Sequence, residues 1–237
     1  MKKLAIISLS GGLDSSTLLA HALASGKDVF TVGFKYGQAN FPELQARKEI
    51  IEHFSKLYPE NYIGDVVFNL EETMNIFTST FQMLRDSNKI KEESNHKFYT
   101  PSRNLLFGVM STVLGETIAL AKDYEKIYIG LGIHKHSEEA YGAHKDYWDI
   151  TPKFAKRFKK LLKLNDVKKV KVYTPFVKYT KTEVVQRALE LEVPIDKTWT
   201  CYSPVFNEDL TYSACNECEA CIERNLAIEN AKRDSIK

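Results

Sequence analysis

Residues able to bind an anion gather in one short loop near the start of the chain, SGGLDSS, from Ser10 to Ser16. Two adjacent glycines let the backbone turn tightly and approach an anion with no Cβ in the way. Successive N–H groups in such a turn form an anion-binding nest, and the start of a following helix adds unpaired N–H donors. We therefore expect phosphate to be held by Leu9, Ser10, Gly11, Gly12, Leu13, Asp14, Ser15, Ser16 and Thr17.

Asp14 is an unexpected residue in such a loop, because a carboxylate beside phosphates is repulsive. It makes sense if Asp14 holds a Mg²⁺ ion that bridges to the phosphates. The simpler interpretation is a plain strand–turn–helix in which Asp14 or Ser15 caps the helix. The complete string, directly after an apolar strand, favours phosphate binding over that interpretation.

The four cysteines of the chain form a second chemical cluster, C-x13-C-x2-C-x2-C, made by Cys201, Cys215, Cys218 and Cys221. Four thiolates suit a closed tetrahedral zinc site. The triplet also resembles iron–sulfur runs, but Asn225 stands where their fourth cysteine would follow, so zinc is favoured. A redox C-x-x-C is a weaker alternative, since no thioredoxin-like strand precedes it. Few large apolar residues surround the cysteines, so metal binding would supply the folding free energy of this segment.

The elements that position these residues follow from apolar runs and helical spacing. Strands are expected over Lys3–Ser10, Asp28–Tyr36, Tyr62–Leu70, Lys126–Gly132 and Val167–Tyr173. Helices are expected over Ser15–Ser25, Pro42–Leu57, Arg103–Lys122, Asp149–Leu164, Thr180–Leu191 and Cys221–Ala231, with Glu71–Tyr99 partly helical and Ser137–Tyr147 a loop. This alternation predicts an α/β fold with a doubly wound, mainly parallel five-stranded sheet.

Ligands of such sheets bind beyond the carboxyl ends of the strands, which places the site at Ser10–Ser16 and at the loop after Gly132. One boundary is expected near residue 198, where the βα pattern gives way to the cysteines. Residues 1–197 would form the nucleotide-binding domain, and 198–237 a zinc-binding segment packed on the same domain.

The charge of the chain gives no global footprint for nucleic acid or membrane, since the net charge is only +2. The lysines of Lys153–Lys171 are interpreted as a solvated helix and strand edge. No signal peptide is visible, and no segment approaches the roughly 20 apolar residues that span a bilayer. A cytoplasmic protein is expected.

Several motifs together carry a resemblance to a known family. The SGGLDSS loop matches the SGGxDS signature of PP-loop ATP pyrophosphatases, and longer stretches resemble the 7-cyano-7-deazaguanine synthase family, also called QueC. These stretches are Tyr36-Gly37-Gln38 with Glu43, the P-x-R-N start Pro101–Asn104, Thr174-Pro175 with Tyr179–Glu183, and Thr198-Trp199-Thr200-Cys201-Tyr202 with the cysteine triplet. The match runs nearly end to end.

The resemblance implies an ATP-dependent, AMP-forming ligase that converts 7-carboxy-7-deazaguanine and ammonia, through the amide, to the nitrile. It implies ATP, Mg²⁺ and Zn²⁺ as cofactors, a homodimer, and no nucleic-acid partner. Asp14, Arg103 and Lys181 are the expected catalytic residues; the simpler interpretations are a helix-start salt bridge for Arg103 and a solvated lysine for Lys181. Substrate would contact Tyr36, Gln38, Arg103, Asn104, Tyr147 and Asp149.

The chain departs from the family pattern on the acceptor side. Tyr147–Phe154 (YWDITPKF) lacks the proline, cysteine, arginine and glutamate of the family's Y-P-D-C-R-x-E-F. Ala39-Asn40 replaces Arg-His, the Cys201–Cys215 loop is extended, and Ile133–Asp146 is long and carries His134, His136 and His144. A second metal at His134 and His136 is disfavoured, because a lone pair of histidines two residues apart in a polar loop is usually just exposed.

Three alternatives therefore stay open. A related ligase would join a deazaguanine acid to another amine, such as one on a protein, in a phage or defence system. A tRNA-modifying PP-loop enzyme is less favoured, because the near-neutral chain lacks an appended basic RNA domain. A nucleotide sensor or zinc scaffold without activity comes last, since every polar group expected of the loop is present.

Overall fold

The structure, a computed structural model, describes residues 2–37, 42–86, 100, 102–135 and 147–234. Of the residues singled out above, Gln38, Ala39, Asn40, Pro101, His136 and His144 lie outside the described ranges.

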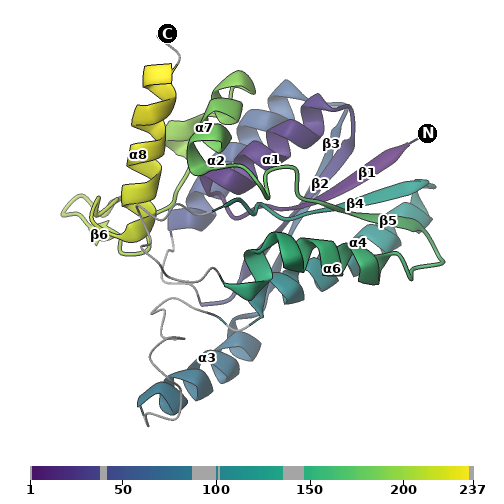
Figure 1. The fold of residues 1–237 in the computed structure, drawn as a ribbon, viewed down its shortest axis with the longest axis horizontal. Coiled ribbons are helices and arrows are strands. Elements are labelled where there is room, and N and C mark those ends of the chain that lie inside the picture. The colour runs from purple at the N-terminus through teal and green to yellow at the C-terminus, as the bar shows by residue number, and fades with distance from the viewer. Residues whose placement is uncertain (1, 38–41, 87–99, 101, 136–146, 235–237) are drawn as a thin grey trace.

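A five-stranded parallel sheet forms the centre of the molecule, which confirms the expected fold class (Figure 1). Its strand order is β3-β2-β1-β4-β5. The strands are β1 (Lys3–Ser8), β2 (Asp28–Lys35), β3 (Tyr62–Asn69), β4 (Lys126–Gly130) and β5 (Lys169–Tyr173). The helices are α1 (Leu13–Ala24), α2 (Pro42–Leu57), α3 (Glu71–Asp86), α4 (Arg103–Ala121), α6 (Pro152–Leu162), α7 (Lys181–Glu190) and α8 (Glu219–Asp234), with 3-10 turns η2 (Trp148–Ile150) and η3 (Ile195–Lys197).

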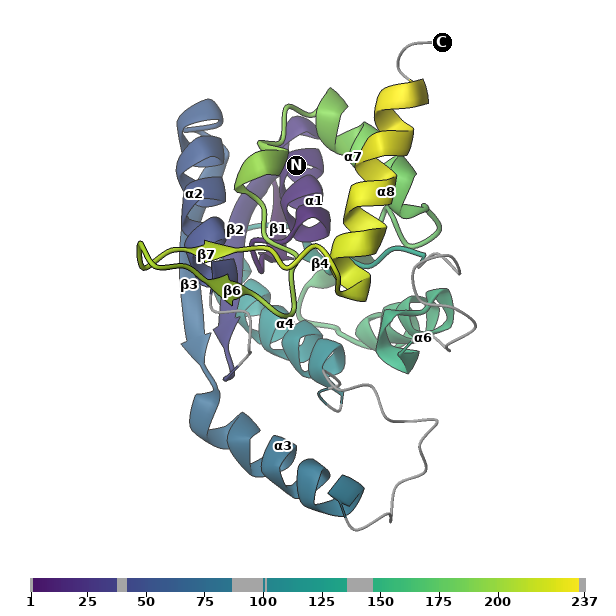
Figure 2. The same cartoon turned by 90° about the vertical axis from the view of Figure 1, so that its left-hand side faces the viewer.

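Helices cover both faces of the sheet at β1, which explains why the sequence of this strand is continuously apolar. Successive side chains of a strand point to opposite faces. Leu4 and Ile6 pack into the core under α4 and α6, whereas Ala5 and Ile7 pack under α1, α2, α7 and α8. The result is a sheet between two helical layers, from which α3 projects (Figures 1 and 2).

Helix α4 is long and apolar enough, by length and composition alone, to cross a membrane, with a mean hydropathy of 1.5 in a window that is 33% buried. The expectation that no segment approaches the length and apolar character of a membrane span overlooked this helix. Core helices pass the same test, and α4 lies against the sheet: a Cβ built on Gly115 would stand 2.8 Å from Ile127 and 3.0 Å from Ile6. Its opposite side exposes Val113 and Leu120.

The helix expected over Asp149–Leu164 is interrupted near its start. Asp149 belongs to η2, and α6 begins only at Pro152. Thr151 is extended and its Oγ1 accepts a hydrogen bond from the Phe154 N–H at 3.1 Å, so Thr151 caps α6. Proline suits the first helical position, because its missing N–H is not needed there.

The extended loop between Cys201 and Cys215 contains a small hairpin that the sequence did not predict. It pairs β6 (Val205–Phe206) with β7 (Tyr212–Ser213), and the rings of Phe206 and Tyr212 pack together. Strands of two residues are too short for any periodic signal.

Helix α7 is fixed by a capping box at its first residue, which also sets the position of Lys181. Thr180 Oγ1 accepts from the Glu183 N–H, and the Thr180 N–H donates to Glu183 Oε2 at 2.7 Å. Thr180→Ala should therefore lower the free energy of unfolding by about 1 kcal/mol, measured by urea denaturation. Thr117→Ala, on an exposed part of α4, is the control and should change it by less than about 0.5 kcal/mol. Equal effects of the two substitutions would contradict the role of the cap.

Candidate functional site

The candidate site lies between β1 and β4, where successive strands stop being added on one side of β1 and start being added on the other. From β1 the chain runs outward to β2 and β3, then returns to place β4 on the other side of β1. Beyond the carboxyl ends of β1 and β4, Gly132 packs on the start of α1: a Cβ on Gly132 would lie 2.9 Å from the Ser15 nitrogen. The glycine loop thus occupies the switch point at which ligands of open α/β sheets bind.

The two loop glycines lie close to neighbouring backbone, and Gly11 is required there by its conformation and contacts. Gly11 has a φ of +100°, and a Cβ there would lie 2.4 Å from the Glu43 carbonyl oxygen and 2.6 Å from the Arg47 nitrogen. Gly12 precedes α1 and lies against Trp199, whose carbonyl oxygen is 3.3 Å from an ideal Cβ on Gly12. A side chain at position 11 would therefore displace the start of α2, whereas one at position 12 would only press on Ser10 and the Trp199 carbonyl.

The loop hydroxyls divide into two groups. Ser10 Oγ and Ser15 Oγ lie 3.1 Å apart at the mouth of the loop. Ser15 Oγ also accepts from the Ser10 N–H at 3.2 Å and donates to the Gly12 carbonyl at 3.1 Å. Ser16 Oγ donates to the same carbonyl at 2.8 Å, and Thr17 Oγ1 to the Leu13 carbonyl at 2.7 Å. The exposed Ser10 is therefore the better candidate for side-chain contact with phosphate, while Ser16 and Thr17 stabilise the first turn of α1.

Two of the predicted catalytic residues meet in the structure. Lys181 Nζ lies 2.8 Å from both carboxylate oxygens of Asp14. The lysine side chain is only 5% exposed, against 24% for the aspartate, so the alternative of a solvated lysine is wrong. A cation is thereby fixed beside the glycine loop.

Arg47 is a residue that sequence reasoning missed. Its Nε donates to the Leu9 carbonyl at 2.9 Å, directly before the glycine loop, and its Nη atoms bind the carboxylate of Asp65. The guanidinium crosses β2 at Gly33, where a Cβ would lie 2.6 Å from Nε. The glycine inside β2 was the available signal, because a strand glycine often marks a close approach.

Replacing Arg47 with Met should lower the free energy of unfolding by about 3 kcal/mol, because it removes a buried partner of Asp65 and of the Leu9 carbonyl. Lys56→Met on the same helix breaks an exposed pair with Glu52 and should cost less than about 1 kcal/mol. Urea denaturation measures both. Equal losses would contradict the assignment of Arg47 as the support of the loop.

A second group of predicted substrate contacts is centred on Arg103, at the start of α4. Arg103 Nη1 donates to the Tyr36 hydroxyl at 3.0 Å, and the guanidinium carbon is 5.7 Å from the centre of that ring. The Tyr36 oxygen, followed by Tyr202 and Glu43, raises the pKa of Arg103. Tyr202 also interacts electrostatically with Tyr147. The structure thus joins Tyr36 directly to Arg103, and it places Tyr202, which the motif contained without a role, near enough to Arg103 to raise its pKa.

Asp149 and Asn104 are joined in a different way. The Asn104 N–H donates to Asp149 Oδ2 at 2.9 Å, and Asp149 is only 2% exposed. A carboxylate at this place satisfies a free N–H and complements the partial positive charge at the start of α4. Asp149 thus fixes the end of α4 that carries Arg103; its contact with substrate stays a prediction.

The four cysteine sulfurs lie within 4.8 Å of one another, and Cys201 Sγ is 3.5 Å from Cys215 Sγ. A tetrahedral ion with metal–sulfur bonds of about 2.3 Å separates its sulfurs by about 3.8 Å, so the group fits one ion. The N–H groups of Glu217 and Cys218 donate to Cys215 and lower the pKa of that thiol to about 7. Burial raises the pKa of Cys201 and Cys221. These residues can hold a metal ion such as zinc.

His134 is buried, contrary to the expectation of an exposed histidine. Its side chain and that of Glu223 are each 4% exposed, with His134 Nε2 3.6 Å from Glu223 Oε2. The pair links the segment after β4 to α8. Sequence spacing could not show this, since the two residues belong to different elements.

Comparison with known proteins agrees with this arrangement. The profile of the family described as "Queuosine biosynthesis protein QueC" matches residues 4–232. A curated relative from Acetivibrio thermocellus, named 7-cyano-7-deazaguanine synthase, is 31% identical over 233 residues, which covers 96% of this chain and 93% of the relative. A relative of the same name from Leptospira interrogans is 30% identical, and the match covers 95% of this chain and 86% of the relative. Another from Prochlorococcus marinus is 31% identical, and the match covers 94% of this chain and 92% of the relative. The chain therefore belongs to the QueC family of queuosine biosynthesis proteins.

Proposed function

We propose that the chain is an AMP-forming ligase that adenylylates 7-carboxy-7-deazaguanine and converts it with ammonia, through the amide, to 7-cyano-7-deazaguanine. The observation that carries the proposal is the ion pair of the buried Lys181 with Asp14, beside a double-glycine loop at the switch point of the sheet. The names of the full-length relatives support the substrate.

The loop is the proposed site of the triphosphate. Backbone N–H groups between Ser10 and Ser16 and the first turn of α1 would bind its β and γ phosphates, with Ser10 and Ser15 hydroxyls as further donors. Lys181 would neutralise charge that develops at the α phosphate. A carboxylate offers about four lone-pair sites, so Asp14 has capacity for both Lys181 and a Mg²⁺ ion.

The acceptor would lie against Arg103. Its guanidinium is suited to a carboxylate, which it can bind through two parallel hydrogen bonds. Tyr36, Tyr147 and Tyr202 offer aromatic surface to a flat heterocycle, and Asn104 and Gln38 are the proposed polar contacts. Burial raises the pKa of Tyr36, so its hydroxyl stays protonated at neutral pH and can donate a hydrogen bond.

The reaction then needs two activations. The substrate carboxylate attacks the α phosphorus of ATP, pyrophosphate leaves, and ammonia displaces AMP with loss of a proton to give the amide. The amide oxygen attacks the α phosphorus of a second ATP; pyrophosphate leaves again, and loss of AMP and a proton gives the nitrile. Charge stabilisation, more than acid or base catalysis, is what these steps require of the site.

Zinc is the proposed ion of the cysteine group, held by Cys201, Cys215, Cys218 and Cys221. A four-iron cluster places irons and sulfides between the thiolates and would hold them further apart. In this proposal the ion is structural and fastens residues 198–237 to the domain of residues 1–197. A homodimer is also proposed, for which the exposed Val113 and Leu120 of α4 are a candidate contact.

Mass spectrometry of products tests the function. Purified protein receives 7-carboxy-7-deazaguanine, ATP, Mg²⁺ and ammonium, and nitrile formation is the expected result. Amide alone, or an adduct with a protein amine, would favour the alternative ligase, which the changed residues of Tyr147–Phe154 keep open. Absence of AMP with any deazaguanine acid would contradict both and leave the tRNA-modifying and sensor alternatives.

A further inference from the structure

The residues just before the first cysteine lie directly on the glycine loop. The Trp199 N–H donates to the Gly11 carbonyl at 3.0 Å, and the Trp199 carbonyl oxygen lies against Gly12. A single residue of the C-terminal segment therefore contacts both glycines. The contact lies at the carboxyl end of the sheet, because Gly11 follows shortly after Ser8, the last residue of β1; the amino end of β1 is at the right in Figure 1.

Arg224, which lies on α8 one turn after Cys221, forms hydrogen bonds with the residues on both sides of Trp199. Its Nη1 donates to Thr198 Oγ1 at 2.7 Å and to Thr200 Oγ1 at 3.0 Å, and its Nη2 donates to the Ile195 carbonyl at 2.6 Å. The two threonines flank Trp199 in the chain. The planar guanidinium presents several donors in a fixed fork, so one side chain sets the position of both neighbours of Trp199.

The charge of Arg224 also reaches the proposed catalytic pair. Burial lowers the pKa of Arg224, while the Asp14 carboxylate acts in the opposite direction. Arg224 is thus a second cation near Asp14, after Lys181, although it belongs to the helix that carries the last cysteine.

We propose that Arg224 is a positioning residue: through Thr198 and Thr200 it keeps Trp199 against Gly11 and Gly12, and so couples the cysteine cluster to the affinity of the loop for ATP. A double-glycine turn is conformationally free, and its ordering on binding would oppose ATP affinity unless the turn is already fixed. The inference rests on the proposed function, since ATP is the proposed ligand of the loop.

Calorimetric titration with ATP tests the inference, with metal content and thermal unfolding measured on every variant. Arg224→Ala should raise the Kd for ATP about tenfold or more while zinc stays at one per chain. Arg224→Lys keeps the charge but loses the fork, so its Kd should also rise, by less. Thr200→Val should reproduce part of the effect without any change of charge.

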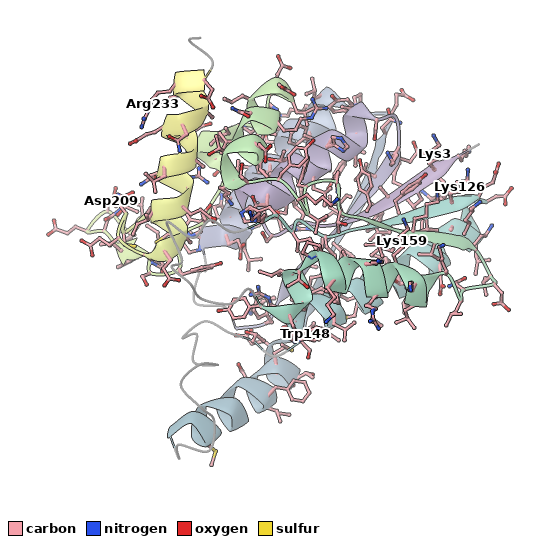
Figure 3. All side chains as sticks on the ribbon, in the orientation of Figure 1. Lys3, Lys126, Trp148, Lys159, Asp209 and Arg233 are labelled. Carbon is pink, nitrogen blue, oxygen red and sulfur yellow. The ribbon has the colours of Figure 1, made fainter. Side chains whose placement is uncertain are left out.

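Arg233→Ala is the matched control, because Arg233 lies on the same helix, is 70% exposed and points away from the core (Figure 3). Its Kd should equal that of the wild type. Unchanged ATP affinity in Arg224→Ala and Thr200→Val, or weaker affinity only where zinc is also lost, would overturn the inference alone. Wild-type protein that binds no ATP would overturn the proposed function together with it. In turnover assays, the KM for ATP should rise more than the KM for the acid.

Discussion

Lys181→Met should lower the rate of AMP formation by about a hundredfold to a thousandfold, which is the cost of removing one fixed group that stabilises transition-state charge. The effect is expected because the substitution removes the cation that lies 2.8 Å from the Asp14 carboxylate, beside the proposed site of the phosphates. Asp14→Asn should give a loss of similar size. Single-turnover measurement of AMP, with enzyme in excess over ATP, separates this loss from product release.

A double variant makes the test sharper. Asp14→Asn and Lys181→Met together remove the ion pair as a unit, so stability should recover relative to Asp14→Asn alone, because the buried Lys181 ammonium is then no longer left without its carboxylate. Activity should not recover. Lys178→Met, three residues before Lys181 and exposed, is the control. AMP formation near the wild-type rate in the double variant would remove both residues from the catalytic account.

Loss of metal binding at the four cysteines is expected to unfold the segment from residue 198 to residue 218, which contains three of them. Cys221→Ser, or removal of metal by a chelator, should abolish metal binding and expose residues between 198 and 218 to protease, because no apolar core supports the hairpin: Val205, Phe206 and Tyr212 are all exposed. ATP affinity should fall with it, since Trp199 would no longer contact the loop.

Metal analysis and limited proteolysis check this prediction. Ser203→Ala is the control, because only the backbone N–H of Ser203 contacts Cys201. One zinc per wild-type chain and none in Cys221→Ser is the expected result. Iron with sulfide in the wild type, or an unchanged cleavage pattern in Cys221→Ser, would contradict the assignment of a structural zinc ion.

The parts of the site that the sequence predicted are those encoded by neighbouring residues. The glycine loop is seven consecutive residues after a buried strand, and three of the four cysteines lie within seven positions. The parallel sheet was predictable for a similar reason, since strands buried on both faces are continuous apolar runs, as in β1. The expected strands ran one or two residues past the observed ends, because apolar residues such as Leu9, Leu70 and Leu131 continue the chain beyond the sheet.

The parts that could not be predicted depend on contacts between distant residues. Arg47 reaches a carbonyl 38 positions away, and Arg224 binds oxygens 24 to 29 positions away. Arginines of this kind are indistinguishable from surface arginines in a single sequence. His134 was misjudged for the same reason, because its burial is created by Glu223 of α8 rather than by its own polar loop.

The fate of the α phosphate is the most direct test of the central claim, that the loop from Ser10 to Ser16 grips the outer phosphates of ATP so that its AMP portion is transferred. ATP labelled at the α phosphorus would be incubated with the protein and 7-carboxy-7-deazaguanine, and the products separated. The account predicts label in AMP, an equal amount of pyrophosphate, and two ATP consumed for each nitrile formed. Label in ADP with release of inorganic phosphate would contradict it.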